Sequence, residues 1–412
     1  MRPNSWTFSM GALIPTLGIA AKYAAAEAQQ SLQLPRGHIP ALDGIRGLAI
    51  LLVTAYRFAG AHDEGTPGWA LPFIDLSSRG VDLFFVLSGF LITGILFDAK
   101  GEAHYFRIFP LYYTTLIVVL VGLPLLGISS NWLKASPADL SSLWLYGGNL
   151  LTSLRGEWTL GGLNHFWSLC VEEHFYLFWP LVIYVCSRAN AMRVCLGLFC
   201  VSAVTRIAWI LLGGNGPASE VFTLFRLDAL CAGAWIALAA RGPGGLGALL
   251  PAARGTFLIA GLLLLPPVLL HMRLKTLPTT LFACFFAASI LLAVAAPRRG
   301  LLSHLGRSRL LQWFGRYSYG MYVYQNLLLY GLGDLFTAQS LQHLTGSALL
   351  GRFGFMFIMS LLTCGLAWLS WHGYEKHWLA WKHLFESKRP TAPCEPLTPP
   401  LQTSEATSSI QS

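Results

Sequence analysis

Long apolar stretches recur along the chain, separated by short polar connections. Ten of them approach twenty residues, the length that an α-helix needs to cross the hydrocarbon core of a bilayer. A shorter stretch at 140–152 is either an eleventh span or a re-entrant or interfacial helix. The pattern therefore predicts an all-α fold, a polytopic transmembrane helix bundle of about ten helices, with an eleventh left open. The ten stretches lie at residues 43–60, 80–97, 108–127, 166–186, 194–212, 223–240, 255–271, 277–296, 313–332 and 350–373.

The composition fits a membrane protein and excludes other classes. Of the 412 residues, 54% are hydrophobic and 11% are charged, whereas soluble globular chains carry about a quarter charged residues. The net charge is +9, but no basic stripe with interleaved stacking aromatics occurs, so we expect no nucleic-acid partner. The eight cysteines show neither a CxxC pair nor a metal-ligand spacing. Free thiols are therefore expected, with no disulfide framework and no metal site.

The positive charges predict which side of the membrane each loop faces. With ten helices and a cytoplasmic N-terminus, most loop lysines and arginines fall on the inner side, as the positive-inside rule requires. Both termini are then cytoplasmic. We expect residues 1–37 to be a cytoplasmic extension, although their basic start and apolar patch also fit a signal peptide. The Pro/Thr/Ser-rich residues 387–412 are expected to be a disordered tail, which leaves 38–386 as the membrane domain.

The first apolar stretch carries two arginines, Arg46 and Arg57. In a helix their spacing is about three turns, which puts both guanidinium groups on one face roughly 16 Å apart. Ionisable groups inside a spanning segment normally face the protein interior or a watery cavity and mark a site or a pathway. Asp43, one turn before Arg46, is its natural partner. The alternative is that both arginines lie near helix ends and extend toward the lipid headgroups.

Several segments resemble the bacterial integral-membrane acyltransferase family 3. Three of them are LDGIRGLAILLV at 42–53, GVDLFFVLSGFLITGIL at 80–96 and WSLCVEEHFYLFWPLV at 167–182. Four more follow the same pattern in the same order. The resemblance covers about residues 38–386, nearly the whole chain. The four further segments are RIFPLYY at 107–113, FRLDALCAGAWIAL at 225–238, FGRYSYGMYVYQN at 314–326 and YEKHWLAWKHLF at 374–385.

The resemblance implies an activity and a place in the cell. Members of the family O-acylate, usually O-acetylate, carbohydrates of the cell surface and secreted carbohydrates. The donor implied is acyl-CoA on the cytoplasmic side, with acetyl-CoA expected, and the acceptor is a carbohydrate or lipid-linked glycan on the outer side. The membrane is then the bacterial inner membrane. The family also implies an essential histidine eleven residues after Arg46, which is position 57 in this chain.

This chain departs from the family pattern at three points. Position 57 is Arg57, and a guanidinium group stays protonated, so it cannot act as a general base. Gln325 stands where relatives commonly carry histidine. The loop before the third span is short and retains only Arg107 as a contact for coenzyme A. Arg298 and Arg299 are further candidates for its phosphates, although the positive-inside rule also explains them.

The remaining candidates for chemistry lie around the VEE motif and in the second span. Acyl transfer to a hydroxyl needs a proton acceptor and donors for the oxyanion. We expect Glu173, with His165 or His174, to supply the base, and Arg46 to orient the donor or its oxyanion. Glu172 shares a helical face with His165. Asp82 is either catalytic or the structural partner of Arg46 or Arg57.

Three functions remain open, and the sequence leaves the oligomeric state undecided. The first is membrane-embedded O-acyl transfer from acyl-CoA to an extracytoplasmic carbohydrate hydroxyl. The second is a non-catalytic relative that binds or exports a glycan or a lipid-linked acceptor, because the histidine position is Arg57. A solute transporter is the weakest of the three, since the sequence shows no inverted repeat.

Overall fold

The computed structural model describes residues 34, 38–59, 68, 70–98, 109–128, 130–214, 216–269, 278–296, 306–333 and 335–380. Every regular element in these ranges is a helix, which confirms the all-α prediction. The terminal segments 1–33 and 381–412, predicted to be mostly an extension and a tail, lie outside the described residues, as do Arg107, Arg298 and Arg299.

Helices of different lengths follow one another along the chain. The first half contains α2 (Pro40–Phe58), α3 (Leu71–Ser77), α4 (Gly80–Asp98), α5 (Phe109–Ile117), η2 (Val118–Gly122), α6 (Leu123–Leu125), η3 (Ser130–Leu133), α7 (Pro137–Ser141), η4 (Ser142–Leu145), α8 (Gly148–Arg155) and η5 (Gly161–Phe166). The second half contains α9 (Trp167–Val185), α10 (Arg188–Leu211), α11 (Ala218–Val221), η6 (Thr223–Arg226), α12 (Leu227–Ala239), α13 (Gly245–Leu269), α14 (Pro278–Ala295), α16 (Arg309–Leu332), α17 (Ala338–Thr345), α18 (Ala348–Ser370), η7 (Trp371–Glu375) and α19 (Lys376–Ala380).

Five helices of the described part are long and apolar enough to cross a membrane. Each of the ten predicted stretches overlaps a helix, but α2, α9 and α16 carry ionisable or amide side chains and α12 has only 13 residues. The number of about ten spans therefore stays a prediction. The five helices are Leu71–Asp98, Arg188–Leu211, Gly245–Pro266, Pro278–Ala295 and Ala348–Trp378.

The stretch at 140–152 does not form one continuous helix. It divides into the short helices η4 and α8, which meet at Tyr146. The backbone of Tyr146 has a φ of 54°, a left-handed conformation that interrupts regular helical hydrogen bonding. A single eleventh span is therefore excluded here, and the segment consists of short helices, as the re-entrant or interfacial alternative requires.

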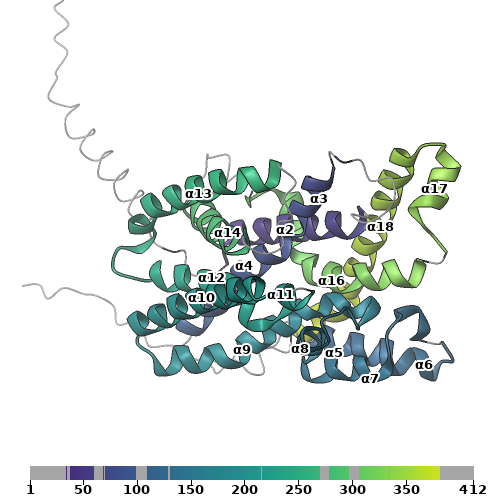
Figure 1. The fold of residues 1–412 in the computed structure, drawn as a ribbon, viewed down its shortest axis with the longest axis horizontal. Coiled ribbons are helices and arrows are strands. Elements are labelled where there is room, and N and C mark those ends of the chain that lie inside the picture. The colour runs from purple at the N-terminus through teal and green to yellow at the C-terminus, as the bar shows by residue number, and fades with distance from the viewer. Residues whose placement is uncertain are drawn as a thin grey trace, which may run out of the picture.

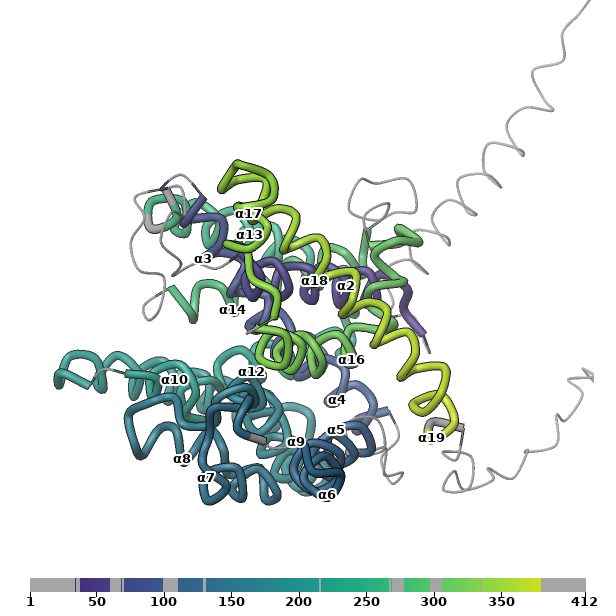
Figure 2. Tube along the Cα trace, turned by 90° about the vertical axis from the view of Figure 1, so that its right-hand side faces the viewer, coloured from purple at the N-terminus to yellow at the C-terminus, as the bar shows by residue number. Residues whose placement is uncertain are grey.

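Helix α2 runs through the middle of the molecule (Figure 1). Helices α13 and α14 lie on one side of it, and α16 and α18 on the other. Helices α5 to α9 follow the lower edge in Figure 1 and occupy the lower part of the turned view in Figure 2. The most extensive helix contacts are those of α2 with α16 and of α4 with α12.

Glycines allow these helix pairs to approach until their backbones touch. A Cβ on Gly47 would lie 1.9 Å from the carbonyl oxygen of Leu311, and one on Gly315 would lie 2.0 Å from that of Asp43. Gly89 of α4 faces the Leu230 backbone of α12 in the same way. Small residues at helix contacts are the usual means of close packing in membranes. The register of α2 on α16, and with it the position of both α2 arginines, is set by these contacts.

Glycine 47 gives a direct test of this close packing. Gly47→Ala should lower the stability of the detergent-solubilised protein by about 1–3 kcal/mol, because the added methyl group forces α2 away from α16. The matched change Gly365→Ala, in a helix position with open space around it, should leave stability unchanged or raise it by up to about 1 kcal/mol. Thermal unfolding monitored by size-exclusion chromatography measures both. Equal effects of the two variants would contradict the close contact.

Candidate active site

The arginines of α2 lie at opposite ends of that helix. Pro40 at its start is already fixed in a helical φ and has no N–H to leave unpaired. In the first turn Asp43 accepts a bond from Arg46 Nη1 at 3.4 Å, which confirms the predicted pair. Arg57 lies in the last turn, half-buried, and its Nε atom is fully buried.

A polar group surrounds the Arg46 end of α2. Ser88 of α4 and Tyr176 of α9 are hydrogen-bonded through their hydroxyl groups. Ser88 is also a hydrogen-bonding neighbour of Glu172. Arg46 lies within electrostatic range of both Glu172 and Tyr176. Side chains from three helices therefore meet at a position where the sequence had suggested only Arg46.

A second group lies at the Arg57 end, between α2, α16 and η5. We call it the Arg57 cluster. Hydrogen bonds join its members to each other and to the backbone. Thr54 donates to Gln325 Oε1 at 3.4 Å, and Tyr322 donates to the carbonyl oxygen of His165 at 2.8 Å. The Asn326 amide donates to the carbonyl oxygen of Gly162 at 2.8 Å. The cluster consists of Thr54, Arg57, His165, Tyr322, Gln325 and Asn326.

Several buried polar atoms of the Arg57 cluster have no hydrogen-bond partner among the described residues. They are Arg57 Nε, His165 Nδ1, Gln325 Nε2 and Asn326 Oδ1. The side chains of His165, Gln325 and Asn326 are at most 1% exposed. A buried polar atom without a partner costs about 1–3 kcal/mol, so such atoms are rare in folded proteins. Four of them lie together here, which makes the Arg57 cluster the candidate place for a polar ligand group.

His165 is held in its neutral form within this cluster. Burial, and then the positive charge of Arg57, lower its pKa from 6.5 to about 3, against the raising effect of the Val323 and Gly162 carbonyl groups. Its Nε2 atom lies 3.2 Å from the Val323 carbonyl oxygen, which can only accept a hydrogen bond. Nε2 therefore carries the proton, and the unpartnered Nδ1 is left as a proton acceptor.

Tyr322 links the two ends. Its hydroxyl lies 2.5 Å from that of Ser168, and the ring lies within electrostatic range of both Arg57 and Glu172. Polar side chains thus continue from Arg46 to Arg57 along α2, over a distance of about 16 Å. We call this set, from Arg46 through Glu172, Ser168 and Tyr322 to the Arg57 cluster, the polar file.

Glu173 and His174 do not join His165. Glu173 is 6% exposed and its Oε1 atom has no partner, but no hydrogen bond or ion pair connects it with either histidine in the described structure. His174 instead bonds through Nδ1 to the Thr223 hydroxyl at 2.8 Å, which also receives a bond from Asn149. The expected carboxylate–imidazole unit is therefore not formed by these residues. Their catalytic roles stay predictions.

The predicted pairing of Asp82 with an α2 arginine is wrong. Asp82 is 1% exposed and bonds to Arg79 Nη1 at 3.1 Å and to Arg226. Arg226 in turn lies over the rings of Phe85 and Trp167. The reason is geometric, because Asp82 begins α4 on the side facing η6 and α14. Both carboxylate oxygens are engaged, and a catalytic role for Asp82 stays a prediction without geometric support.

Sequence reasoning missed Thr54, Ser168, Tyr322 and Asn326. A signal was present for two of them, because Tyr322 and Asn326 are separated by one helical turn and share a face of α16 with Gln325. Polar side chains at such spacing inside an apolar segment indicate a buried polar contact. Thr54 and Ser168 could not be found in this way, since each is a single small hydroxyl residue.

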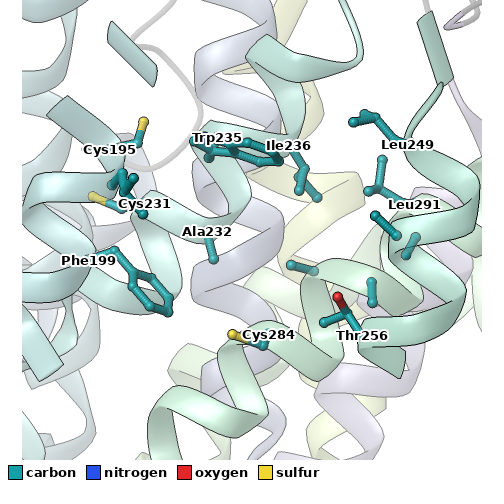
Figure 3. A pocket seen from close by; sticks show the side chains of 15 residues that line it. Cys195, Phe199, Cys231, Ala232, Trp235, Ile236, Leu249, Thr256, Cys284 and Leu291 are labelled. Carbon is teal, nitrogen blue, oxygen red and sulfur yellow. The ribbon is translucent and has the colours of Figure 1, made fainter. Parts of the chain in front are cut away.

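A separate apolar crevice of about 240 Å³ lies between α10, α12, α13 and α14. In Figure 3, Trp235 and Ile236 lie toward one end and Cys284 and Thr256 toward the other. Apart from thiol groups, its lining contains no acid or base, so it offers apolar contacts and no proton acceptor for acyl transfer. The seven cysteines of the described part form no disulfide, as predicted. Nor do its His, Cys, Asp and Glu side chains gather into a metal-binding group.

Comparison with known proteins identifies relatives of the chain. The model of acyltransferase family 3, described as an acyltransferase domain, matches residues 39–372. The putative peptidoglycan O-acetyltransferase YrhL of Bacillus subtilis is 29% identical over 378 residues, which cover 82% of this chain and 54% of that protein. The peptidoglycan O-acetyltransferase OatA of Listeria monocytogenes is 29% identical over 198 residues, 43% of this chain and 30% of that protein. The chain thus spans about half the length of YrhL and less than a third of the length of OatA. No solved structure matches it.

Asp82→Asn tests whether this carboxylate is structural. Removing its charge leaves Arg79 and Arg226 buried without compensation, which should lower stability by about 3–5 kcal/mol. The matched change Asp98→Asn affects a pair with Arg241 whose aspartate is 62% exposed, and should cost about 1 kcal/mol or less. Thermal unfolding in detergent measures both. A stable Asp82→Asn variant would contradict the structural role.

The depressed pKa of His165 predicts a pH dependence of stability. The unfolded chain takes up a proton on this residue below about pH 6.5, whereas the folded chain does not until about pH 3. Stability contributed by neutral His165 is therefore complete above pH 6.5 and is lost as the pH falls. Between pH 7.5 and 5.5 the loss should be about 1.4 kcal/mol, and His165→Gln should abolish that part of the slope. Identical slopes in the two proteins would rule out the buried neutral state.

Proposed function

This chain belongs to acyltransferase family 3, and from that premise we propose that it moves an acyl group from acyl-CoA to a carbohydrate hydroxyl across the membrane. The observation that supports this most is the polar file, a series of buried and half-buried polar side chains along α2 in an otherwise apolar bundle. Polar groups inside an apolar helix bundle are costly unless they contact a substrate or each other. A file with unpartnered atoms at one end fits a reaction site.

The donor approaches the Arg46 end from the cytoplasm. The loop charges predict that the start of α2 faces that side, and acetyl-CoA is the expected donor because the named relatives are O-acetyltransferases. Arg46, with the Ser88 and Tyr176 hydroxyl groups, orients the donor where it enters the polar file, and the thioester carbonyl of the donor reaches the Arg57 end. Arg107, Arg298 and Arg299, outside the described residues, remain the candidates for the coenzyme A phosphates.

The acceptor hydroxyl reacts at the Arg57 end. His165 Nδ1 takes the hydroxyl proton while the hydroxyl oxygen attacks the thioester carbonyl carbon. The Arg57 guanidinium group stabilises the resulting oxyanion, in the manner of an oxyanion hole. Collapse of this intermediate breaks the carbon–sulfur bond, and the departing thiolate of coenzyme A takes the proton that His165 had accepted. His165 is preferred to Glu173 and His174 because it is the proton acceptor next to Arg57.

The acceptor is a carbohydrate of the bacterial cell envelope, either a polymer or a lipid-linked glycan. The names of YrhL and OatA refer to peptidoglycan, a carbohydrate polymer outside the inner membrane. An inner-membrane location with both termini in the cytoplasm agrees with the loop charges. Transfer from the inner to the outer side then follows from where the two substrates are found.

A second candidate is a non-catalytic relative that binds or exports a glycan. Arg57 and Gln325 favour it, because neither can act as a base at a position where the family carries histidine. In that case the Arg57 cluster would bind the glycan without transferring an acyl group. The two candidates differ in one measurable property, the turnover of acyl-CoA.

Label transfer from acetyl-CoA separates the candidates. Purified protein in nanodiscs, with labelled acetyl-CoA and cell-wall glycan fragments, should transfer label to the glycan. His165→Gln should lower the rate about 10²- to 10⁴-fold, the usual contribution of a general base. The same change at the exposed residue His343 serves as the matched control. Glu173→Gln and His174→Gln test the other two bases.

The remaining outcomes decide against parts of this proposal. A loss of activity in Glu173→Gln with His165→Gln unaffected would move the base to Glu173. A wild-type protein without transfer, in which Arg57→His restores it, would support the non-catalytic relative.

A further inference from the structure

Arginines inside this bundle are matched by aspartates. Arg79 and Arg226 share Asp82, and Arg206 bonds to Asp228 at 2.7 Å. All three arginines are at most 6% exposed. Pairing of this kind is required because an uncompensated charge in a low-dielectric interior costs several kcal/mol.

Arg57 differs from these arginines. Its Nε atom is fully buried, yet no carboxylate of the described residues forms an ion pair with it. Among the described residues, its charge opposes the protonation of His165 and lies within electrostatic range of the Tyr322 hydroxyl. The chain therefore brings a positive charge to this cluster without matching it from the described part of the structure.

The Gln325 amide lies on the same side of α2 as Arg57, because its partner Thr54 is three residues before Arg57 on that helix. Gln325 is 0% exposed, and Thr54 fixes its orientation by donating to Oε1. Its Nε2 atom consequently points away from Thr54 and has no acceptor. Arg57 Nε and Gln325 Nε2 are thus two N–H donors, one of them charged, that need acceptors. A carboxylate offers two acceptor oxygens and a compensating negative charge.

We propose that Arg57 and Gln325 form a carboxylate-binding site, so that the substrate reaching this end of the polar file carries a carboxylate group. That the bound carboxylate belongs to a substrate rests on the proposed acyl transfer, whereas the binding site itself does not. Two sources share this chemistry. One is an acidic acceptor sugar such as a hexuronic acid, and the other is an acyl donor derived from a dicarboxylic acid.

The same site explains how His165 becomes an adequate base. A carboxylate bound to Arg57 compensates the charge that opposes protonation of the imidazole. Binding of the acidic substrate therefore strengthens the proton acceptor next to it. A neutral analogue would leave His165 beside an uncompensated guanidinium group.

Equilibrium binding tests the proposal without requiring turnover. Calorimetry on the full chain in nanodiscs compares an oligosaccharide of hexuronic acid with its carboxyl-reduced neutral form, and succinyl-CoA with acetyl-CoA. In one of the two pairs, the carboxylate should tighten binding about ten- to a hundredfold, as for a charged hydrogen bond. The pair that shows the preference identifies the source. Arg57→Gln should remove it, and Arg57→Lys should retain part of it.

Two further variants make the result decisive. Gln325→Glu supplies an internal carboxylate to Arg57 and should abolish the preference while the protein stays folded, as measured by thermal unfolding. The double variant Asp63→Asn/Glu64→Gln removes the acidic residues that follow Arg57 most closely in the sequence and should leave the preference unchanged. Equal binding of acidic and neutral ligands by the wild type would overturn the proposal. So would a preference that appears only in the double variant, because a carboxylate of the chain itself would then occupy Arg57.

These results are independent of the proposed function. A carboxylate preference in a protein without acyl transfer would retain the binding site and reject the enzyme. Acyl transfer without any such preference would retain the enzyme and reject the carboxylate-binding site.

Discussion

Ionisable side chains inside an apolar helix bundle are tolerated only where their charge is compensated. In this protein aspartates at the starts of α4 and α12 provide the compensation. Asp82 bonds to Arg79 and Arg226, and thereby ties α4 to η6. Asp228 ties α12 to α10 through Arg206, with Thr280 of α14 completing the group. Among the described residues, the buried arginines of this half are paired with aspartates, and the half also contains the apolar crevice.

The other half is organised around α2, and its polar groups are not fully matched. Close glycine contacts fix α2 against α16, so the positions of Arg46 and Arg57 are determined by backbone packing and not by the side chains themselves. Polar residues from α9, η5 and α16 then meet this helix along its length. In the first half the charges of the buried arginines are paired, which makes it a structural network. In the half around α2 the charge of Arg57 is not paired within the described residues, which makes it the candidate site.

The replacement of the family's histidine by Arg57 has a consequence that extends beyond one residue. A guanidinium group cannot accept a proton, but after burial its charge is the second cause that keeps the imidazole of His165 neutral, and it offers charge to an oxyanion or a carboxylate. Gln325, at a position where the family resemblance implies histidine, likewise offers an amide donor. The two departures lie in one cluster and are chemically consistent with each other. They therefore describe an altered site better than two independent losses.

The sequence by itself determined the helical class, the approximate limits of the helices, the family and the contacts formed within one turn. Asp43 with Arg46 is such a contact, because residues three apart on a helix are neighbours whatever the tertiary structure.

The tertiary structure alone decided which distant residues meet. In it Asp82 bonds to Arg79 and Arg226, and His165 lies within electrostatic range of Arg57. Among the described residues, Glu173 forms no hydrogen bond with His165 or His174, and His174 bonds to Thr223 instead. Apolar periodicity cannot reveal these outcomes, because hydrocarbon surrounds the bundle and the rotation of each helix is set by packing and polar contacts with its neighbours.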